Sequence, residues 1–86
     1  MTAIDLSSNS LHGTLPCELT SLSELRSVDL SDNLLSGSLG FTGRSWPVTL
    51  VKLDLAHNLL GAGTAMDVGT MPILEYLDLS ANNGGT

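Results

Sequence analysis

The sequence predicts a small parallel-sheet solenoid, in which short units of similar sequence stack and each contributes one strand. Three observations predict it: one spacing recurs along the chain, apolar and polar residues alternate at the same place in every unit, and each unit has an asparagine at its ninth position. The units begin at Met1, Leu25, Leu50 and Leu74, so their spacings are 24, 25 and 24 residues. A fixed period in this range is the signature of a repeat architecture.

The beginning of every unit is predicted to form a strand. Its fourth and sixth positions are apolar and flank one polar residue, in the pairs Ile4 and Leu6, Val28 and Leu30, Leu53 and Leu55, and Leu77 and Leu79. Because side chains alternate along a strand, both apolar residues point to one buried face. Four such strands would stack in parallel about 4.8 Å apart, and each unit would close the core of its neighbour.

The asparagine column has a structural explanation. The ninth positions are Asn9, Asn33, Asn58 and Asn82. After the strand the backbone leaves the sheet, and its N–H and C=O groups need partners there. An amide side chain supplies both donors and an acceptor. We therefore predict a structural asparagine ladder that binds turn backbones rather than a ligand.

Residues 1–11, 25–35, 50–60 and 74–84 follow the pattern L-x-x-L-x-L-x-x-N-x-L, except that the last unit lacks its final leucine. This pattern resembles the leucine-rich repeat family. The continuation L-H-G-T-L-P-C-E-L-T-S-L of the first unit is similar to the 24-residue subtype that is common in plant receptor-like proteins. The second unit departs from that subtype at Gly40, and the third loses its signature. The resemblance implies an α/β solenoid that forms a right-handed superhelix, with a parallel sheet on its concave face and irregular or short 3-10 segments on its convex face.

The residues between the strands are predicted to return along the convex side. Residues 16–22 would form a turn of tight helix or extended chain, because Pro16 needs no ladder hydrogen bond. Residues 40–49 hold the one extra residue of the second unit. Trp46 and Phe41 are interpreted as core residues, and the alternative is that one of them is an exposed binding anchor.

The period divides the chain into repeats 1–24, 25–49 and 50–73 and a partial repeat 74–86. Because a solenoid needs its ends covered, we expect a fragment of a longer array, with neighbouring repeats at both ends. The sequence does not indicate a compartment. The resemblance implies an extracellular or cell-surface parent protein.

Composition narrows the class of partner. The chain has 3 Lys plus Arg against 9 Asp plus Glu, a net charge of −6. Nucleic acids and anionic membranes demand a positive face, so neither is expected as a partner. No stretch approaches the ~20 apolar residues that span a bilayer, so membrane insertion by this segment is not expected.

Candidate catalytic chemistry is weak. His12 and His57 occupy different positions of their units, and Cys17 has Glu18 beside it rather than a base or cation that would lower its pKa. Residues 61–66 lack the spacing and the lysine of a phosphate-binding loop. We expect no enzyme activity, no cofactor and no metal.

An aspartate column is the most notable feature of the accessible face. The fifth positions are Asp5, Asp29, Asp54 and Asp78, which would align at strand spacing on the concave surface. Neighbouring carboxylates would repel by about 1 kcal/mol in water. Three interpretations remain: a solvated column, an acidic stripe that selects a basic peptide or protein, and a calcium or magnesium site. A flat row of single carboxylates offers few oxygens per ion, which disfavours the metal.

The other candidate binding residues of this face are Arg26, Lys52, His57 and Tyr76, which can make directional contacts. Together with the resemblance, they predict non-catalytic recognition of a protein or peptide ligand on the concave face. Two alternatives are a structural spacer or capping segment, and a ligand-binding ectodomain piece of a receptor-like kinase.

Overall fold

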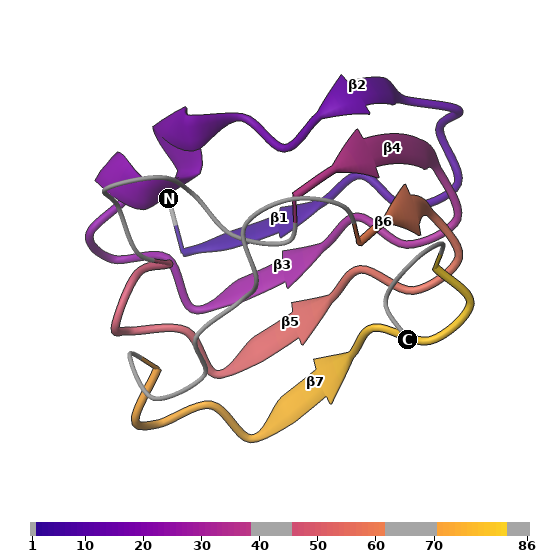
Figure 1. The fold of residues 1–86 in the computed structure, drawn as a ribbon. Helices are drawn as coiled ribbons and strands as arrows, with labels where there is room; N and C mark the ends of the chain where they lie inside the picture. The colour runs from indigo at the N-terminus through magenta and orange to yellow at the C-terminus, as the bar shows by residue number, and fades with distance from the viewer. Residues whose placement is uncertain (1, 39–45, 62–70, 83–86) are drawn as a thin grey trace.

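The first of two parallel sheets contains the predicted strand of every unit. The computed structural model describes residues 2–38, 46–61 and 71–82. Strands β1 (Ala3–Asp5), β3 (Ser27–Asp29), β5 (Lys52–Asp54) and β7 (Tyr76–Asp78) lie side by side in that order (Figure 1). Neighbours pair in the register of the sequence repeat, because Ile4 is opposite Val28, and Leu53 is opposite both Val28 and Leu77. The predicted solenoid of parallel strands is therefore confirmed.

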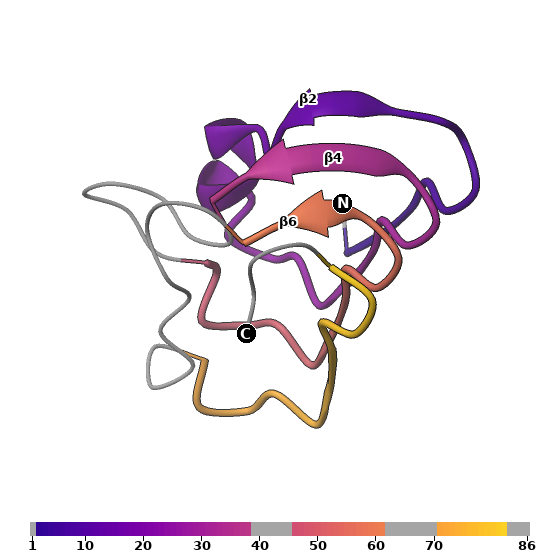
Figure 2. The ribbon, with the colours of Figure 1, turned by 45° about the vertical axis from the view of Figure 1, so that its right-hand side comes forward.

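The second sheet was not predicted from the sequence. It consists of β2 (His12–Thr14), β4 (Leu34–Gly37) and β6 (Leu59–Leu60), which pair in parallel in that order. Its strands run opposite to those of the first sheet (Figures 1 and 2), because the chain turns back after Asn9, Asn33 and Asn58. The backbone at Gly13 and Gly37 has φ of 96° and 86°, which few side chains tolerate.

A single turn of 3-10 helix, η1 (Cys17–Ser21), connects β2 to β3. It begins after Pro16, whose fixed φ suits this position and whose missing N–H leaves no donor without a partner. Leu19 is buried under it, and the amide of Leu22 donates to the Leu19 carbonyl at 3.3 Å. This turn is the short 3-10 segment expected on the return side.

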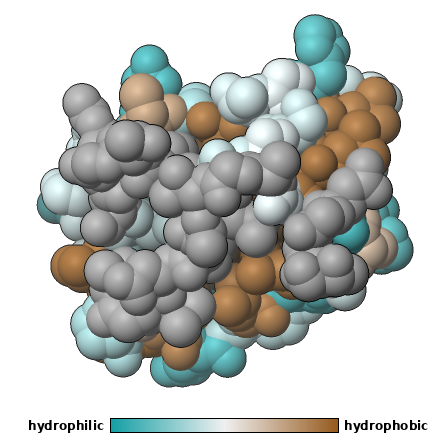
Figure 3. Space-filling model, viewed as in Figure 1, coloured by the Kyte–Doolittle hydropathy of each residue, from teal (hydrophilic) through white to brown (hydrophobic). Residues whose placement is uncertain are grey.

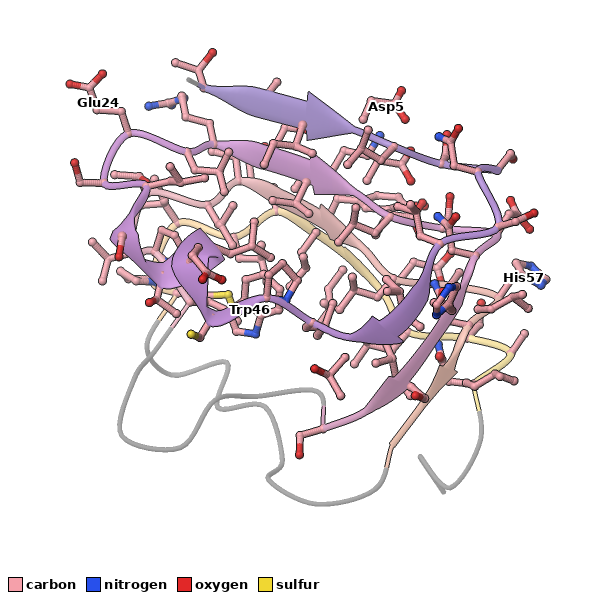
Figure 4. The ribbon with its side chains drawn as sticks, turned by 90° about the horizontal axis from the view of Figure 1, so that it is seen from above. Asp5, Glu24, Trp46 and His57 are labelled. Carbon is pink, nitrogen blue, oxygen red and sulfur yellow. The ribbon has the colours of Figure 1, made fainter. Side chains whose placement is uncertain are left out.

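The core fills the space between the two sheets. Its fully buried side chains belong to the second and third units: Leu25, Val28, Leu50, Leu53, Leu55 and Leu60. Trp46 is 3% exposed and packs in this core (Figure 4), which supports the core interpretation of that residue. Phe41 lies outside the described residues.

The two end units bury their leucines poorly. Leu6 is 46% exposed, whereas its equivalents Leu30 and Leu55 are 5% and 0% exposed. Leu77 is 38% exposed, although the equivalent Leu53 is fully buried. Burial of these sheet leucines thus depends on having a neighbouring unit on both sides, whereas Leu15 and Leu19 of the first unit are buried without a preceding one. No helix in the described part of the chain is long and apolar enough to cross a membrane.

Candidate functional site: the outer face of the four-stranded sheet

The candidate site is the face of the first sheet that points away from the second sheet, called the outer face below. It corresponds to the face that was predicted to be concave. In Figure 4, Asp5 projects from this face, on the opposite side of the sheet from the buried Trp46. Alternation places the third and fifth residues of each unit here, because the fourth residue points into the core.

The four aspartates lie in one row across the outer face. The strand register sets Asp29 opposite Asp5 and Asp54, and Asp78 opposite Asp54. Three of the carboxylates are held by a serine two residues later. The Ser31 hydroxyl and amide, for example, donate to Asp29 Oδ1 at 2.6 and 3.1 Å.

The same pair of bonds joins Ser7 to Asp5 and Ser80 to Asp78. Asp54 has Ala56 at the corresponding place, so among the described residues it accepts from the Ala56 amide alone, at 3.1 Å. These bonds hold the carboxylates in a fixed orientation.

The bonds from the serines also favour the charged form of the acids. The Ser7 hydroxyl and amide lower the pKa of Asp5 below its ordinary value of 3.8. The Ser80 hydroxyl and amide, in that order, likewise lower the pKa of Asp78. A lowered folded-state pKa stabilises the fold above the ordinary value, and this contribution is lost as the pH falls through the folded-state pKa. Both carboxylates are therefore ionised at neutral pH.

Lys52 and Tyr76 form a cross-strand pair beside the aspartates. They are opposite each other in β5 and β7, and Lys52 Nζ lies 5.4 Å from the centre of the Tyr76 ring. This is within the range of a cation–π interaction. The Tyr76 hydroxyl donates to Asp78 Oδ2 at 3.5 Å. The negative charge of Asp54, followed by burial and the charge of Asp78, raises the pKa of Tyr76 above 10.0.

Arg26 and His57 lie at opposite borders of the outer face. Arg26 is exposed and directly precedes β3, and its amide donates to the Thr2 carbonyl at 2.7 Å. His57 is in the turn after β5 and projects at the far end of the sheet in Figure 4. The structure therefore brings Lys52 and Tyr76 together with the aspartate row, and it places Arg26 and His57 at the edges.

The asparagine ladder lies behind this face and links neighbouring turns. Asn33 is 5% exposed, and its Oδ1 accepts from the amides of Asn9 and Leu11 at 3.0 and 2.9 Å. Its Nδ2 contacts the carbonyls of both its own turn and the preceding one: Leu6, Leu30 and Ser31, each at 3.0 Å.

Asn58 and Asn82 make equivalent contacts one and two units later. Asn9 is exposed, and its Nδ2 donates to the Ser7 carbonyl at 3.0 Å. No buried side-chain nitrogen or oxygen lacks a partner in the part of the chain that the structure describes.

The eighth position of every unit has a left-handed backbone, which sequence reasoning missed. The values of φ are 56–58° at Ser8, Asp32, His57 and Ala81. Asp32 and His57 belong to residue types that are enriched in this region, but Ser8 and Ala81 do not, so the column carried no consistent signal. The left-handed turn after β5 thus places His57 at the border of the outer face.

Within residues 2–38, 46–61 and 71–82, no three His, Cys, Asp or Glu side chains are grouped so that they could hold a metal ion. Cys17 is a free, exposed thiol in η1. His12 is in β2 of the second sheet, whereas His57 follows β5 of the first. The chemistry that the described residues bring together is therefore a row of oriented carboxylates with an aromatic ring and an amine at one end.

The comparisons agree with the repeat structure. A family model described as Leucine Rich Repeat matches residues 1–22. Transforming growth factor beta activator LRRC32 of Mus musculus is 39% identical over 84 residues, which are 94% of this chain and 12% of that protein. Toll-like receptor 9 of Mus musculus is 40% identical over 84 residues, covering 93% of this chain and 8% of that protein.

Leucine-rich repeat receptor protein kinase MSP1 of Oryza sativa subsp. japonica is 33% identical over 79 residues, which are 88% of this chain and 6% of that protein. The chain thus spans no more than 12% of the length of these relatives. No solved structure matches it significantly. The repeated sequence, the stacked strands and these matches together identify the chain as a member of the leucine-rich repeat family.

Proposed function

We propose that this chain is a non-catalytic recognition module that binds a basic segment of a protein or peptide on its outer face. The observation that carries the proposal is the aspartate row, in which serines fix the orientation of three carboxylates and lower the pKa of Asp5 and Asp78. Carboxylates that stay ionised at neutral pH suit salt bridges to lysine and arginine, and they are poor general acids.

The dimensions of the row fit a short extended segment. Four strands at about 4.8 Å spacing give a row of about 14 Å, which an extended peptide covers with four to five residues at about 3.3 Å each. Tyr76 is 46% exposed at one end of the row. An exposed tyrosine offers rigid, partly polar contact area, as in many protein interfaces. The ligand would therefore carry two or more basic residues near an apolar one.

The test is direct binding of a short labelled peptide of alternating Lys and Ser, measured by fluorescence anisotropy at low salt. Asp29→Lys with Asp54→Lys should abolish measurable binding, because it reverses charge at the centre of the row. The control, Glu18→Lys with Glu24→Lys, changes the net charge equally at two exposed positions outside the row. Equal affinity of both double variants for the peptide would refute the outer-face site.

One alternative is a structural spacer or capping segment in a longer array of repeats. It is favoured by the exposed leucines of both end units, such as Leu6 and Leu77, which a further repeat would bury. Under this alternative, charge reversal at Asp29 and Asp54 would leave partner binding by the longer protein unchanged. Another is that the chain is part of a receptor ectodomain, since two of the relatives are named as receptors.

A further inference from the structure

The outer face has one aromatic ring in the part of the chain that the structure describes, that of Tyr76. The third positions of the four units are Ala3, Ser27, Lys52 and Tyr76, and the fifth positions are the aspartates. The outer face is therefore mostly polar, whereas apolar side chains, in brown, reach the surface among polar ones in the view of Figure 3. A cation that binds to the outer face has this single ring to contact.

Lys52 already places its ammonium group on the Tyr76 ring. The two residues are opposite each other in β5 and β7, and Lys52 Nζ lies 5.4 Å from the ring centre. Lys52 is half-buried, whereas Tyr76 is 46% exposed. The ring therefore holds a cation of the protein itself at the place where it would hold a cation of a ligand.

Two carboxylates flank this ring. The Tyr76 hydroxyl donates to Asp78 Oδ2 at 3.5 Å, so the ring lies along β7 toward Asp78. The charge of Asp54 is the largest cause of the raised pKa of Tyr76, which indicates that this carboxylate is close to the phenol. Asp54 is followed by Ala56 where the other three aspartates are followed by a serine. One acceptor position that a serine hydroxyl fills elsewhere in the row is thus left for a ligand.

Small side chains on the other side of Lys52 give it room to move. Lys52 is opposite Ser27 on β3, and Ser27 is opposite Ala3 on β1. Because the lysine stem is flexible, its ammonium group can turn from the ring across these two small residues. This direction leads toward Asp5, whose pKa is lowered chiefly by Ser7 and to a smaller extent by the charge of Lys52. The displaced cation would therefore still lie on an acidic surface.

We propose that Lys52 is an internal competitor for a cation subsite on the outer face: it occupies the Tyr76 ring in the free protein, and a basic side chain of the ligand displaces it toward Ser27. The inference rests on the proposed recognition of a basic segment and adds which contact the ligand has to replace. The subsite fits an alkylammonium or a guanidinium group, because both bind to an aromatic ring and pair with carboxylates beside it.

The competition has an energetic consequence for binding. A ligand cation that reaches the ring gains one cation–π contact, but Lys52 loses one when it leaves, so the ring adds little to the affinity of the wild type. Lys52→Met removes that loss and the repulsion between the two cations, and the flexible methionine side chain keeps the space beside Tyr76 filled. Removing the positive charge of Lys52 should therefore strengthen binding more than removing one elsewhere on the outer face.

The first test is binding of the labelled peptide of alternating Lys and Ser, measured by fluorescence anisotropy at low salt. Lys52→Met should bind the peptide at least about threefold more tightly than Arg26→Met does. Arg26→Met is the matched control, because it also removes one positive charge from the outer face. Arg26 directly precedes β3, which β5 separates from Tyr76 on β7. Equal affinities of Lys52→Met and Arg26→Met for the peptide would overturn the inference.

A Tyr76→Leu background separates competition for the ring from simple loss of charge. In this background neither Lys52 nor the ligand has a ring to contact. Lys52→Met should therefore improve peptide affinity there no more than Arg26→Met does. If the full gain of Lys52→Met persists in Tyr76→Leu, the gain does not come from the ring and the inference is wrong.

Nuclear magnetic resonance follows the displacement directly, because Lys52 is the single lysine of the chain. Protein labelled with carbon-13 at lysine Cε is titrated with unlabelled peptide. In the free wild type the Tyr76 ring should shift the Cε protons upfield, and in Tyr76→Leu these protons should have ordinary chemical shifts. As the peptide saturates the wild type, the Lys52 signal should move to the position found in Tyr76→Leu.

The outcomes distinguish this inference from the proposed function. A Lys52 signal that stays in place while the peptide saturates the protein overturns the competition and leaves recognition of basic segments standing. If neither the wild type nor Lys52→Met binds the peptide, the proposed function is refuted, and the inference is refuted with it.

Discussion

At the scale of the residue, Asn58 shows how this fold replaces missing backbone partners. Its side chain is 3% exposed and contacts four backbone groups of two neighbouring units. Its Oδ1 accepts the Leu35 amide at 3.0 Å, and its Nδ2 contacts the carbonyls of Leu30, Leu55 and Ala56. An aliphatic side chain of similar size would leave all four without this partner.

Asn58→Ala should lower the free energy of unfolding by about 1–3 kcal/mol, the cost of one buried polar group left unpaired, because the Leu35 amide loses its acceptor. The carbonyls that Asn58 contacts keep other donors: Asn33 for Leu30, Asn82 for Leu55, and the Asp32 amide for Ala56. Urea unfolding followed by circular dichroism measures the loss. Asn9→Ala is the matched control: Asn9 is exposed, and among the described residues its side chain donates to the Ser7 carbonyl alone, so the loss should stay below about 1 kcal/mol. Equal losses would contradict the ladder as a source of stability.

At the scale of the element, neighbouring strands control the charge of the outer face. Tyr76 on β7 is opposite Lys52 on β5, and its pKa is raised chiefly by Asp54, two residues beyond Lys52 on β5. The ionised phenolate would add a negative charge to the aspartate row, so the row disfavours it. The strand pairing thus supplies the largest cause of the raised pKa of Tyr76, and Asp78 on the same strand adds to it.

Asp54→Asn should lower the pKa of Tyr76 toward 10.0, because it removes the largest of the charges that raise it. Near-ultraviolet absorbance during an alkaline titration measures this cleanly, since Tyr76 is the single tyrosine of the chain. Asp5→Asn is the control, because Asp5 is on β1 at the other side of the sheet and is not among the causes of the shift. An unchanged pKa in Asp54→Asn would mean that β5 and β7 do not pair in this register.

The elements also show how far sequence reasoning reaches. The first sheet could be predicted because Val28 and Leu30 flank a polar residue in a pattern that four units share. The second sheet could not, since β6 is only two residues long and Gly37 in β4 is a poor strand former. The position of His57 depends on a left-handed turn, which could not be predicted because the equivalent residues Ser8 and Ala81 are of types that rarely adopt it.

At the scale of the whole molecule, stability is a sum over units and over the junctions between them. The two interior units hold the fully buried leucines, and the end units each lack a neighbour on one side. The stack therefore has three junctions to offset the ordering of four units. Three junctions for four units leave only a small free energy of unfolding, as is usual for chains of this size.

The 86-residue chain, measured dilute so that it is monomeric, should unfold below about 60 °C, the upper end for ordinary domains. Inserting a second copy of residues 25–49 after residue 49 should raise the midpoint, because it adds an interior unit and one more junction. An insert of the same length and shuffled sequence is the control and should lower it. A midpoint above 60 °C for the monomer, or no gain from the added unit, would contradict the additive account.

The one unit of unequal length shows where this architecture can change. The second unit has 25 residues instead of 24, and yet Ser27 is still opposite Lys52, and Asn33 and Asn58 occupy equivalent turns. The extra residue falls in the sequence between β4 and β5. Length can therefore vary there without shifting the aspartate row, while the outer face varies by substitution alone. Evolution or a designer could alter the ligand and the loop lengths of this scaffold independently.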